Sequence, residues 1–115
     1  MNTISVVAAL GALAHEHRLA IYRLLVEAGP AGLPAGVIAE RLGVPPSSLS
    51  FHTKGLVQAG IARQRRASRQ LIYAADFDAM NELIGYLTDN CCGGAPCAPC
   101  SAPTPADADE SRKTA

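Results

Sequence analysis

Four cysteines, the whole thiol content of the 115-residue chain, lie together in the stretch NCCGGAPCAPC, residues 90–100. Cys91 and Cys92 are adjacent, and Cys97 and Cys100 form a C-x-x-C pair a few residues later. Thiolates are the ligands that soft metals and metalloids prefer. In a reducing compartment, clustered cysteines are more often metal ligands or redox groups than structural disulfides. The stretch therefore predicts a site for a soft ion or for thiol redox chemistry.

The residues between the cysteines favour a chain that turns back on itself. Gly93-Gly94 frees the backbone after the first pair, and Pro96 stiffens the return toward Cys97. Three thiolates suit trivalent arsenic, which keeps a lone pair, whereas four suit Zn(II) or Cd(II). Cys100 is therefore a replacement for Cys97 as third ligand, a fourth ligand, or a spare thiol.

Other metal-binding or thiol chemistry is less favoured. His15 and His17 are two residues apart, so on one helix they would point to different sides and make a poor chelate.

An oxidoreductase built on Cys97 and Cys100 would need a low-pKa thiolate, usually at a helix N-terminus, but this pair follows a predicted helix C-terminus. The chain also lacks the alternating strands and helices of such redox folds, so we expect no enzyme. A structural zinc knuckle that holds a dimer is a further alternative.

The elements before the cysteines form a recognisable series. Apolar periodicity and breaker residues predict four successive helices, at residues 3–14, 16–28, 35–42 and 46–59. The last two are joined by the tight turn GVPP, which is typical of a helix-turn-helix. Residues 61–75 alternate and end in β-formers, which predicts a basic hairpin with its tip at Ala67-Ser68. The expected fold is mainly α with a small β-hairpin wing, a winged helix-turn-helix.

Polar and basic side chains on the fourth helix and the hairpin predict DNA contact. In a winged helix the second helix of the helix-turn-helix enters the major groove, while the wing contacts the neighbouring backbone. The residues expected at DNA are Ser47, Ser48, Ser50, His52, Lys54, Arg63, Arg65, Arg66 and Arg69. A solvated turn or an ordinary exposed helix face would explain either set alone, but the order of the elements favours DNA.

The charge distribution agrees with DNA binding. Residues 1–75 hold eight Lys and Arg against three acidic residues, a net charge of +5. The remaining forty hold two against seven, a net charge of −5, so that the overall charge of zero conceals a basic half.

A last helix is expected to begin after the N-cap Asp76. Along it, an apolar stripe recurs at steps of three and four residues and ends at a cysteine: Phe77, Met80, Ile84, Leu87 and Cys91. Such a stripe predicts a partner helix, and the modest core of about 100 folded residues also favours a homodimer.

The chain divides by composition into three segments. Residues 1–92 are expected to form the DNA-binding and dimerisation domain, 93–100 a cysteine-rich ligand loop, and 101–115 a polar, Pro-rich disordered tail. The longest apolar run, Val6 to Ala14, is shorter than the roughly 20 residues that a membrane span needs. We therefore expect a cytoplasmic protein without a membrane partner.

Most of the chain resembles the arsenic-repressor (ArsR/SmtB) family of dimeric winged-helix metalloregulators. The resemblance covers roughly residues 5–90, and rests on ALGALAHEHRLAIYRLLVEAG, VIAERLGVPPSSLSFHTKGLVQAGIARQRRASRQLIYAA and the helix behind them. Its most specific piece is SLSFHTKGLVQAGIARQRR. It implies a homodimeric repressor, built largely on the first and last helices, that binds an inverted repeat in a promoter and releases it on binding a metal or metalloid.

Two familiar ligand sites of that family are absent. The stretch GLPAGVIAERL has none of the paired cysteines that many arsenite-sensing members carry there, and DFDAMNELIGYLTDN has no histidine of the zinc-sensing kind. The terminal cluster instead resembles that of a smaller group of arsenite repressors, with a Cys-Cys pair and a third cysteine shortly afterwards.

This resemblance implies As(III) or Sb(III) as inducer, bound by Cys91, Cys92 and Cys97, with no cofactor for DNA binding and control of arsenic-resistance genes. Cys100 departs from the pattern and stays a possible ligand. A regulator that responds to Zn(II), Cd(II) or thiol oxidation remains the alternative.

Overall fold

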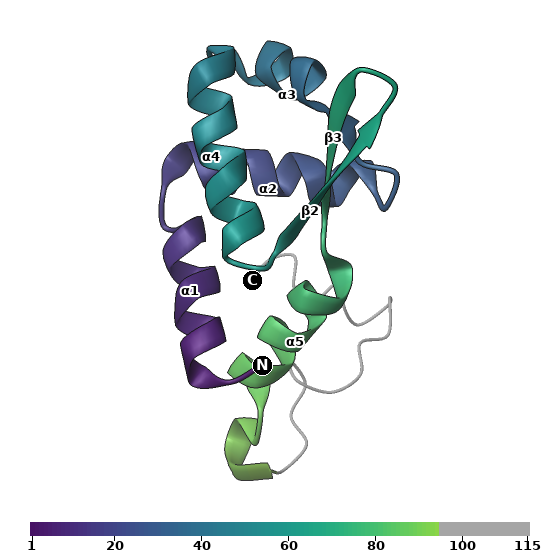
Figure 1. Ribbon diagram of the computed structural model, residues 1–115. Coiled ribbons are helices and arrows are strands. Elements are labelled where there is room, and N and C mark those ends of the chain that lie inside the picture. The colour runs from purple at the N-terminus through teal and green to yellow at the C-terminus, as the bar shows by residue number, and fades with distance from the viewer. Residues whose placement is uncertain (95–115) are drawn as a thin grey trace, which may run out of the picture. The chain divides into compact units, whose positions relative to one another are not determined.

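The computed structural model describes residues 1–94, which form helices around a small antiparallel sheet (Figure 1). Its helices are α1 (Thr3–Leu13), α2 (Glu16–Ala28), α3 (Ala35–Leu42), α4 (Pro46–Gln58) and α5 (Phe77–Thr88). Its strands are β1 (Leu33–Pro34), β2 (Ala62–Ala67) and β3 (Gln70–Ala75), and a 3-10 turn covers Cys91–Gly94. The predicted fold class, mainly α with a hairpin wing, is confirmed.

The chain divides into two compact units, Met1–Ile84 and Gly85–Ala115, and the boundary falls inside α5. The division expected from composition, at residues 92 and 100, stays a prediction, because residues 95–115 lie outside the described part. None of the helices in residues 1–94 is long and apolar enough to span a membrane by itself. Only α1 and α2 taken together reach that length, and the chain bends by 103° between them.

The turn between α3 and α4 is made by a left-handed glycine. Gly43 ends α3 with φ of 65°, a conformation that a residue with a Cβ adopts only at a cost. The next amide, of Val44, donates to the carbonyl of Ala39 at 3.1 Å. Pro46 then starts α4 at a position where a missing N–H costs nothing. These residues place α4 at a defined angle to α3.

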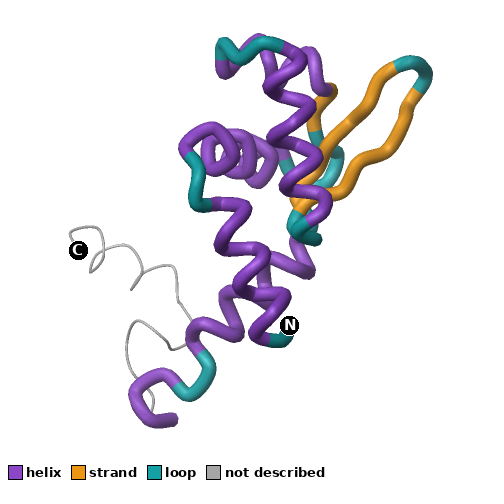
Figure 2. Tube along the Cα trace, turned by 60° about the vertical axis from the view of Figure 1, so that its left-hand side comes forward, coloured by secondary structure: helices purple, strands orange, loops and turns teal. Residues whose placement is uncertain are grey.

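The wing is formed by β2 and β3, which pair in antiparallel register from Ala62 opposite Ala75 to Ala67 opposite Gln70. The hairpin stands off from the helices (Figure 2). Its loop is Ser68-Arg69, with Ser68 at φ of 59°, so the predicted tip is correct to within one residue. The two-residue strand β1 was missed by the sequence analysis; it pairs with the other edge of β3, and its Pro34 is tolerated on an edge strand.

The core lies where α2 crosses α4 beneath the sheet (Figure 1). Six aliphatic side chains with almost no exposed surface form its centre: Ile21, Leu25, Ile38, Leu49, Leu56 and Ile61. From α1, the small residues Ala9 and Ala12 face inward with Val6. Two other apolar residues of α1, Ile4 and Val7, are 81% and 62% exposed.

The last helix begins as expected. The Asp76 carboxylate accepts from the amide of Ala79 at 3.0 Å, which confirms it as N-cap. The predicted dimer stripe divides into two kinds of residue. Phe77 and Met80 are half-buried and pack against the core of their own chain, whereas Ile84 and Leu87 are 52% and 58% exposed. The stripe as a dimer seam stays a prediction.

Candidate nucleic-acid interface and thiol site

The outer face of α4 presents small polar groups and one cation. Ser47, Ser50 and Lys54 are exposed, as expected, and Ser48 is half-buried. Phe51 is 65% exposed between them, an unusual place for a large aromatic ring. Phe51 was not among the residues expected at DNA; its signal in the sequence is an apolar residue inside an otherwise polar helix face.

His52 faces the protein and does not lie with the exposed polar residues of α4, so its outward placement is wrong, while its contact with DNA stays a prediction. Its side chain is only 7% exposed, because its position on α4 points toward the start of α2. The neighbouring Thr53 is also buried, and its hydroxyl donates to the carbonyl of Leu49 at 2.9 Å. The inner face of α4 is therefore partly polar.

Arg18 of α2 fills the space beside His52. Its Nε donates to His52 Nδ1 at 3.4 Å, and its guanidinium lies 5.3 Å from the centre of the Phe51 ring. Gly55 makes room for it, since a Cβ at that position would lie 2.5 Å from the guanidinium carbon. Arg18 therefore joins α2 to α4 and is not a free basic group.

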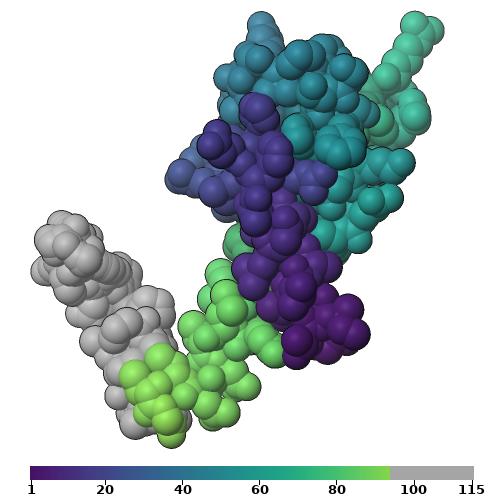
Figure 3. Space-filling model, turned by 90° about the vertical axis from the view of Figure 1, so that its left-hand side faces the viewer, coloured from purple at the N-terminus to yellow at the C-terminus, as the bar shows by residue number. Residues whose placement is uncertain are grey.

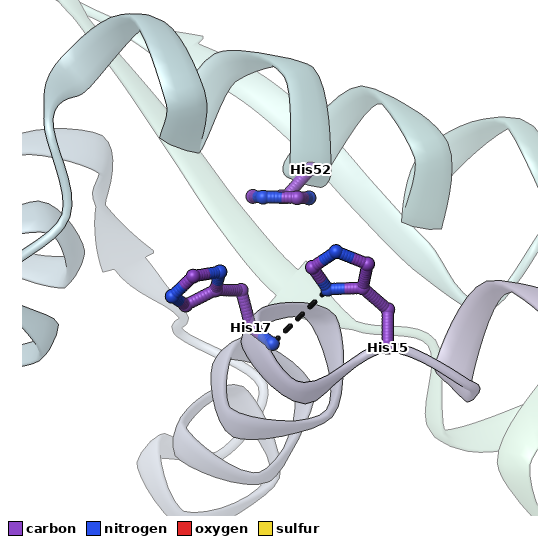
Figure 4. A group of neighbouring side chains, drawn as sticks. All are labelled: His15, His17 and His52. Atoms are coloured by element: carbon purple, nitrogen blue, oxygen red, sulfur yellow. Dashed lines mark hydrogen bonds between the residues drawn. The ribbon is translucent and has the colours of Figure 1, made fainter.

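Three histidines meet at this junction, one from α4 and two from the start of α2 (Figure 4). His15 is not on the helix: it is the N-cap residue in extended conformation, with φ of −154°, and its Nδ1 accepts from the His17 amide at 3.2 Å. The expectation that His15 and His17 point to different sides of one helix is therefore wrong. One ligand nitrogen from each ring, with His52, lies within 4.8 Å of the others.

The base of the wing is tied to the protein by two of its arginines. Arg63 Nε donates to Asp76 Oδ2 at 3.1 Å, and Arg65 Nη2 donates to the carbonyl of Ala31 at 3.0 Å. Partial burial by itself raises the pKa of Asp76. Hydrogen bonds from the Ala79 amide and from Arg63, with the charge of Arg63, outweigh this effect, so that the pKa is lowered.

The tip of the wing carries the other two arginines. Arg66 and Arg69 are exposed, and among the residues that the structure describes neither has a hydrogen-bond or ion-pair partner. The tip projects as a narrow ridge in green at the upper right of Figure 3. These two guanidinium groups are the ones available to phosphates.

The thiol site begins directly after α5, in the second unit. The Cys91 and Cys92 sulfur atoms lie 3.6 Å apart. Asn90, Cys92 and Gly93 all have positive φ, at 57°, 58° and 69°, and Cys91–Gly94 form a 3-10 turn. The predicted return of the chain toward the first two cysteines lies outside the described residues. Cys97 and Cys100 lie outside the described residues, and their part in the site stays a prediction.

Comparison with known proteins agrees with this architecture. A family model described as a helix-turn-helix domain matches residues 13–65. HlyU from Vibrio cholerae is 30% identical, with 75% of this chain and 94% of that chain covered and a TM-score of 0.61. Mb0332 from Mycobacterium bovis is described as a homodimeric winged helix-turn-helix DNA-binding domain of a possible ArsR-family regulator. It is 25% identical over 75% of this chain and 80% of its own, with a TM-score of 0.59.

The chain belongs to the ArsR family of winged-helix regulators. A curated relative is the nodulation protein NolR of Rhizobium meliloti, 31% identical over 80 residues, or 70% of this chain. The match spans 63% of the length of that relative. The ArsR-type part is the winged helix; the cysteine cluster is a separate feature that follows it.

Proposed function

We propose that this ArsR-family protein is a transcriptional repressor that binds operator DNA as a homodimer and releases it when As(III) or Sb(III) binds its C-terminal cysteines. The observation that carries the DNA-binding half is the arrangement in the Met1–Ile84 unit. There, α4 exposes a polar face and the wing tip holds two guanidinium groups with no partner in the described chain.

The DNA contacts are divided between α4 and the wing. Ser47, Ser50 and Lys54 suit base edges and phosphates in the major groove, and the exposed Phe51 ring suits the methyl group of thymine. Arg66 and Arg69 bind phosphates, which positions the protein without reading sequence.

The dimer surface is supported by apolar groups that the single chain leaves in solvent. Ile4, Val7 and Leu10 form an exposed stripe on α1, and Ile84 is exposed on α5. Exposed aliphatic side chains at helical spacing are typical of a partner interface. Mb0332, to which this chain is similar, is described as homodimeric. Two-fold symmetry would match a pseudo-palindromic operator.

The inducer is supported by the donor set. A soft ion with bonds of roughly 2.3 Å to sulfur holds two thiolates roughly 3.3–3.8 Å apart. The Cys91 and Cys92 sulfurs are 3.6 Å apart, and Cys91, which is disulfide-bonded in this structure, becomes a ligand when it is reduced. A third thiolate from Cys97 completes the pyramidal set that trivalent arsenic favours, with control of arsenic-resistance genes as the consequence. Ligation fixes the end of α5 and shifts the spacing of the two subunits, and so favours the DNA-free form of the dimer.

The test is a DNA-shift titration of the full chain with As(III), Sb(III), Cd(II) and Zn(II). We expect As(III) to lower operator affinity at least a hundredfold, about 2.7 kcal/mol. Cys91→Ser, Cys92→Ser and Cys97→Ser should each abolish this response, and Cys100→Ser is the matched control that should keep it.

Each other outcome has a definite meaning. If Cys100→Ser abolishes release and Cys97→Ser does not, Cys100 is the third ligand. Release by Zn(II) or Cd(II), or by an oxidant alone, identifies the alternative regulator. A response unchanged in all four variants removes the cysteine site from the proposal and leaves DNA binding standing.

A further inference from the structure

We propose that His15, His17 and His52 form a binding site for a divalent first-row transition ion such as Zn(II), separate from the cysteines. The three imidazoles converge from the start of α2 and from α4, and His52 is 35 residues from His17 and 37 from His15 in sequence. The packing of α2 on α4 brings them together. Imidazole nitrogen is the ligand that Zn(II), Cu(II) and Ni(II) share as a preferred donor.

The distances need only small side-chain movements. Three nitrogens bound to one tetrahedral ion at bonds of roughly 2.0–2.1 Å lie roughly 3.3 Å apart. Here the ligand nitrogens lie within 4.8 Å of one another. His15 and His17 are exposed, so their rings can rotate inward, while the buried His52 supplies a fixed ligand.

The site has the donor count of an open metal centre. Three protein ligands leave a fourth position for water, and two of the three, His15 and His17, are exposed to solvent. Burial, followed by the charges of His15, Arg18 and His17, lowers the pKa of His52.

Two hydrogen bonds made by these histidines would change when a metal ion binds. In the present arrangement His15 Nδ1 accepts from the His17 amide, and His52 Nδ1 accepts from Arg18, so a ring proton sits on Nε2 and not on Nδ1. If the ion binds Nε2, the ring proton moves to Nδ1, which can then no longer accept the hydrogen bond from the His17 amide or from Arg18. If the ion binds Nδ1, it takes the place of these two hydrogen-bond donors. A metal ion therefore changes the tautomer or the bonded nitrogen, which a cluster of merely packed rings does not do.

The site would connect the first turn of α2 to α4. If α4 reads DNA, as proposed above, the ion fixes the position of the reading helix against the body of the protein. This second consequence rests on the proposed function, whereas metal binding itself does not.

The experiment uses the full, tag-free chain with all four cysteines changed to serine, which removes thiol ligands. Zn(II) binding is measured by competition with a chromophoric chelator, and Co(II) is used as a spectroscopic probe. We expect one ion per chain and Co(II) d–d bands without a sulfur charge-transfer band. Imidazole ¹⁵N spectra should show a changed protonation pattern in His15 and His52 on addition of Zn(II).

Two variants locate the site without disturbing the fold. His17→Ala removes an exposed ring, and His15→Asn removes a ring but keeps a good N-cap. Each should weaken Zn(II) binding at least tenfold. Glu16→Gln, between them, is the matched control and should leave it unchanged.

Failure has a clear form. No Zn(II) bound at micromolar concentration, or binding that both histidine variants leave intact, overturns the proposal. Since no DNA or arsenite is present in the assay, that result would leave the proposed repressor function untouched, and loss of DNA binding would equally leave the metal site standing.

Discussion

The base and the tip of the wing carry the same residue type and do different things. Arg63 and Arg65 at the base are held by Asp76 and by the carbonyl of Ala31, whereas Arg66 and Arg69 at the tip have no partner in the described chain. Both pairs are exposed and both count equally toward the charge of the basic half. The difference shows that a run of arginines is not one surface: half of it builds the hairpin, and half is left for a ligand.

The largest effect is expected at the tip. Arg66→Ala with Arg69→Ala should lower operator affinity by roughly one to two orders of magnitude, and should reduce the salt dependence of binding by about 0.9 for each phosphate that is no longer neutralised. The matched control is the base pair, Arg63→Ala with Arg65→Ala, which removes the same charge and should change affinity less than about threefold. Equally weakened binding in the two double variants, measured as a function of salt, would remove the distinction.

The next effect is expected at the anchor of the base. Asp76→Ala removes both the cap of α5 and the partner of Arg63, and should cost about 1–2 kcal/mol of unfolding free energy. Urea denaturation measures it. Because folding lowers the pKa of Asp76, the stabilisation is present above the ordinary pKa of 3.8 and is lost as pH falls through the lower folded value. The gap between wild type and Asp76→Asn should therefore close in acid; a gap that stays constant there would contradict the shift.

The smallest effect is expected at Arg65. Its bond to Ala31 is exposed, so Arg65→Ala should cost only about 0.2–1 kcal/mol of stability. Arg65→Lys keeps the charge but loses the planar guanidinium group, and separates the contribution of geometry from that of charge. A thermal melt in which Arg65→Ala equals Asp76→Ala would show that the two anchors are of equal strength.

The features that depend on only a few neighbouring residues were predicted correctly from the sequence. Asp76 as a cap, glycine in the turn before α4 and the hairpin tip each depend on a few neighbouring residues, and each is where the sequence indicated. The order of these elements was sufficient to predict a winged helix. The strand β1 escaped because two residues, one of them proline, have no periodicity to detect.

The wrong placements of side chains share one cause: the sequence does not show which distant segments pack against each other. His52 was assigned to the outer face of α4, because nothing local shows that Arg18 and two histidines lie against it. His15 and His17 were treated as two positions of one helix, although the helix was expected at residue 16, where it begins in the structure, so that His15 lies outside it. Two arginines of the wing are held by hydrogen bonds to distant residues. Asp76 lies 13 residues from Arg63, and Ala31 lies 34 residues from Arg65.

Substitution of Gly55 would change the packing between α2 and α4 without removing any functional side chain. A methyl group at this position would displace the Arg18 guanidinium. The hydrogen bond from Arg18 to His52 and the contact of Arg18 with the Phe51 ring would then be lost. Alanine also favours a helix over glycine by roughly 1 kcal/mol, so the helix itself gains from the change. Gly55→Ala would therefore loosen the coupling between α2 and α4, while the three histidines and the DNA-facing side chains keep their chemical identity.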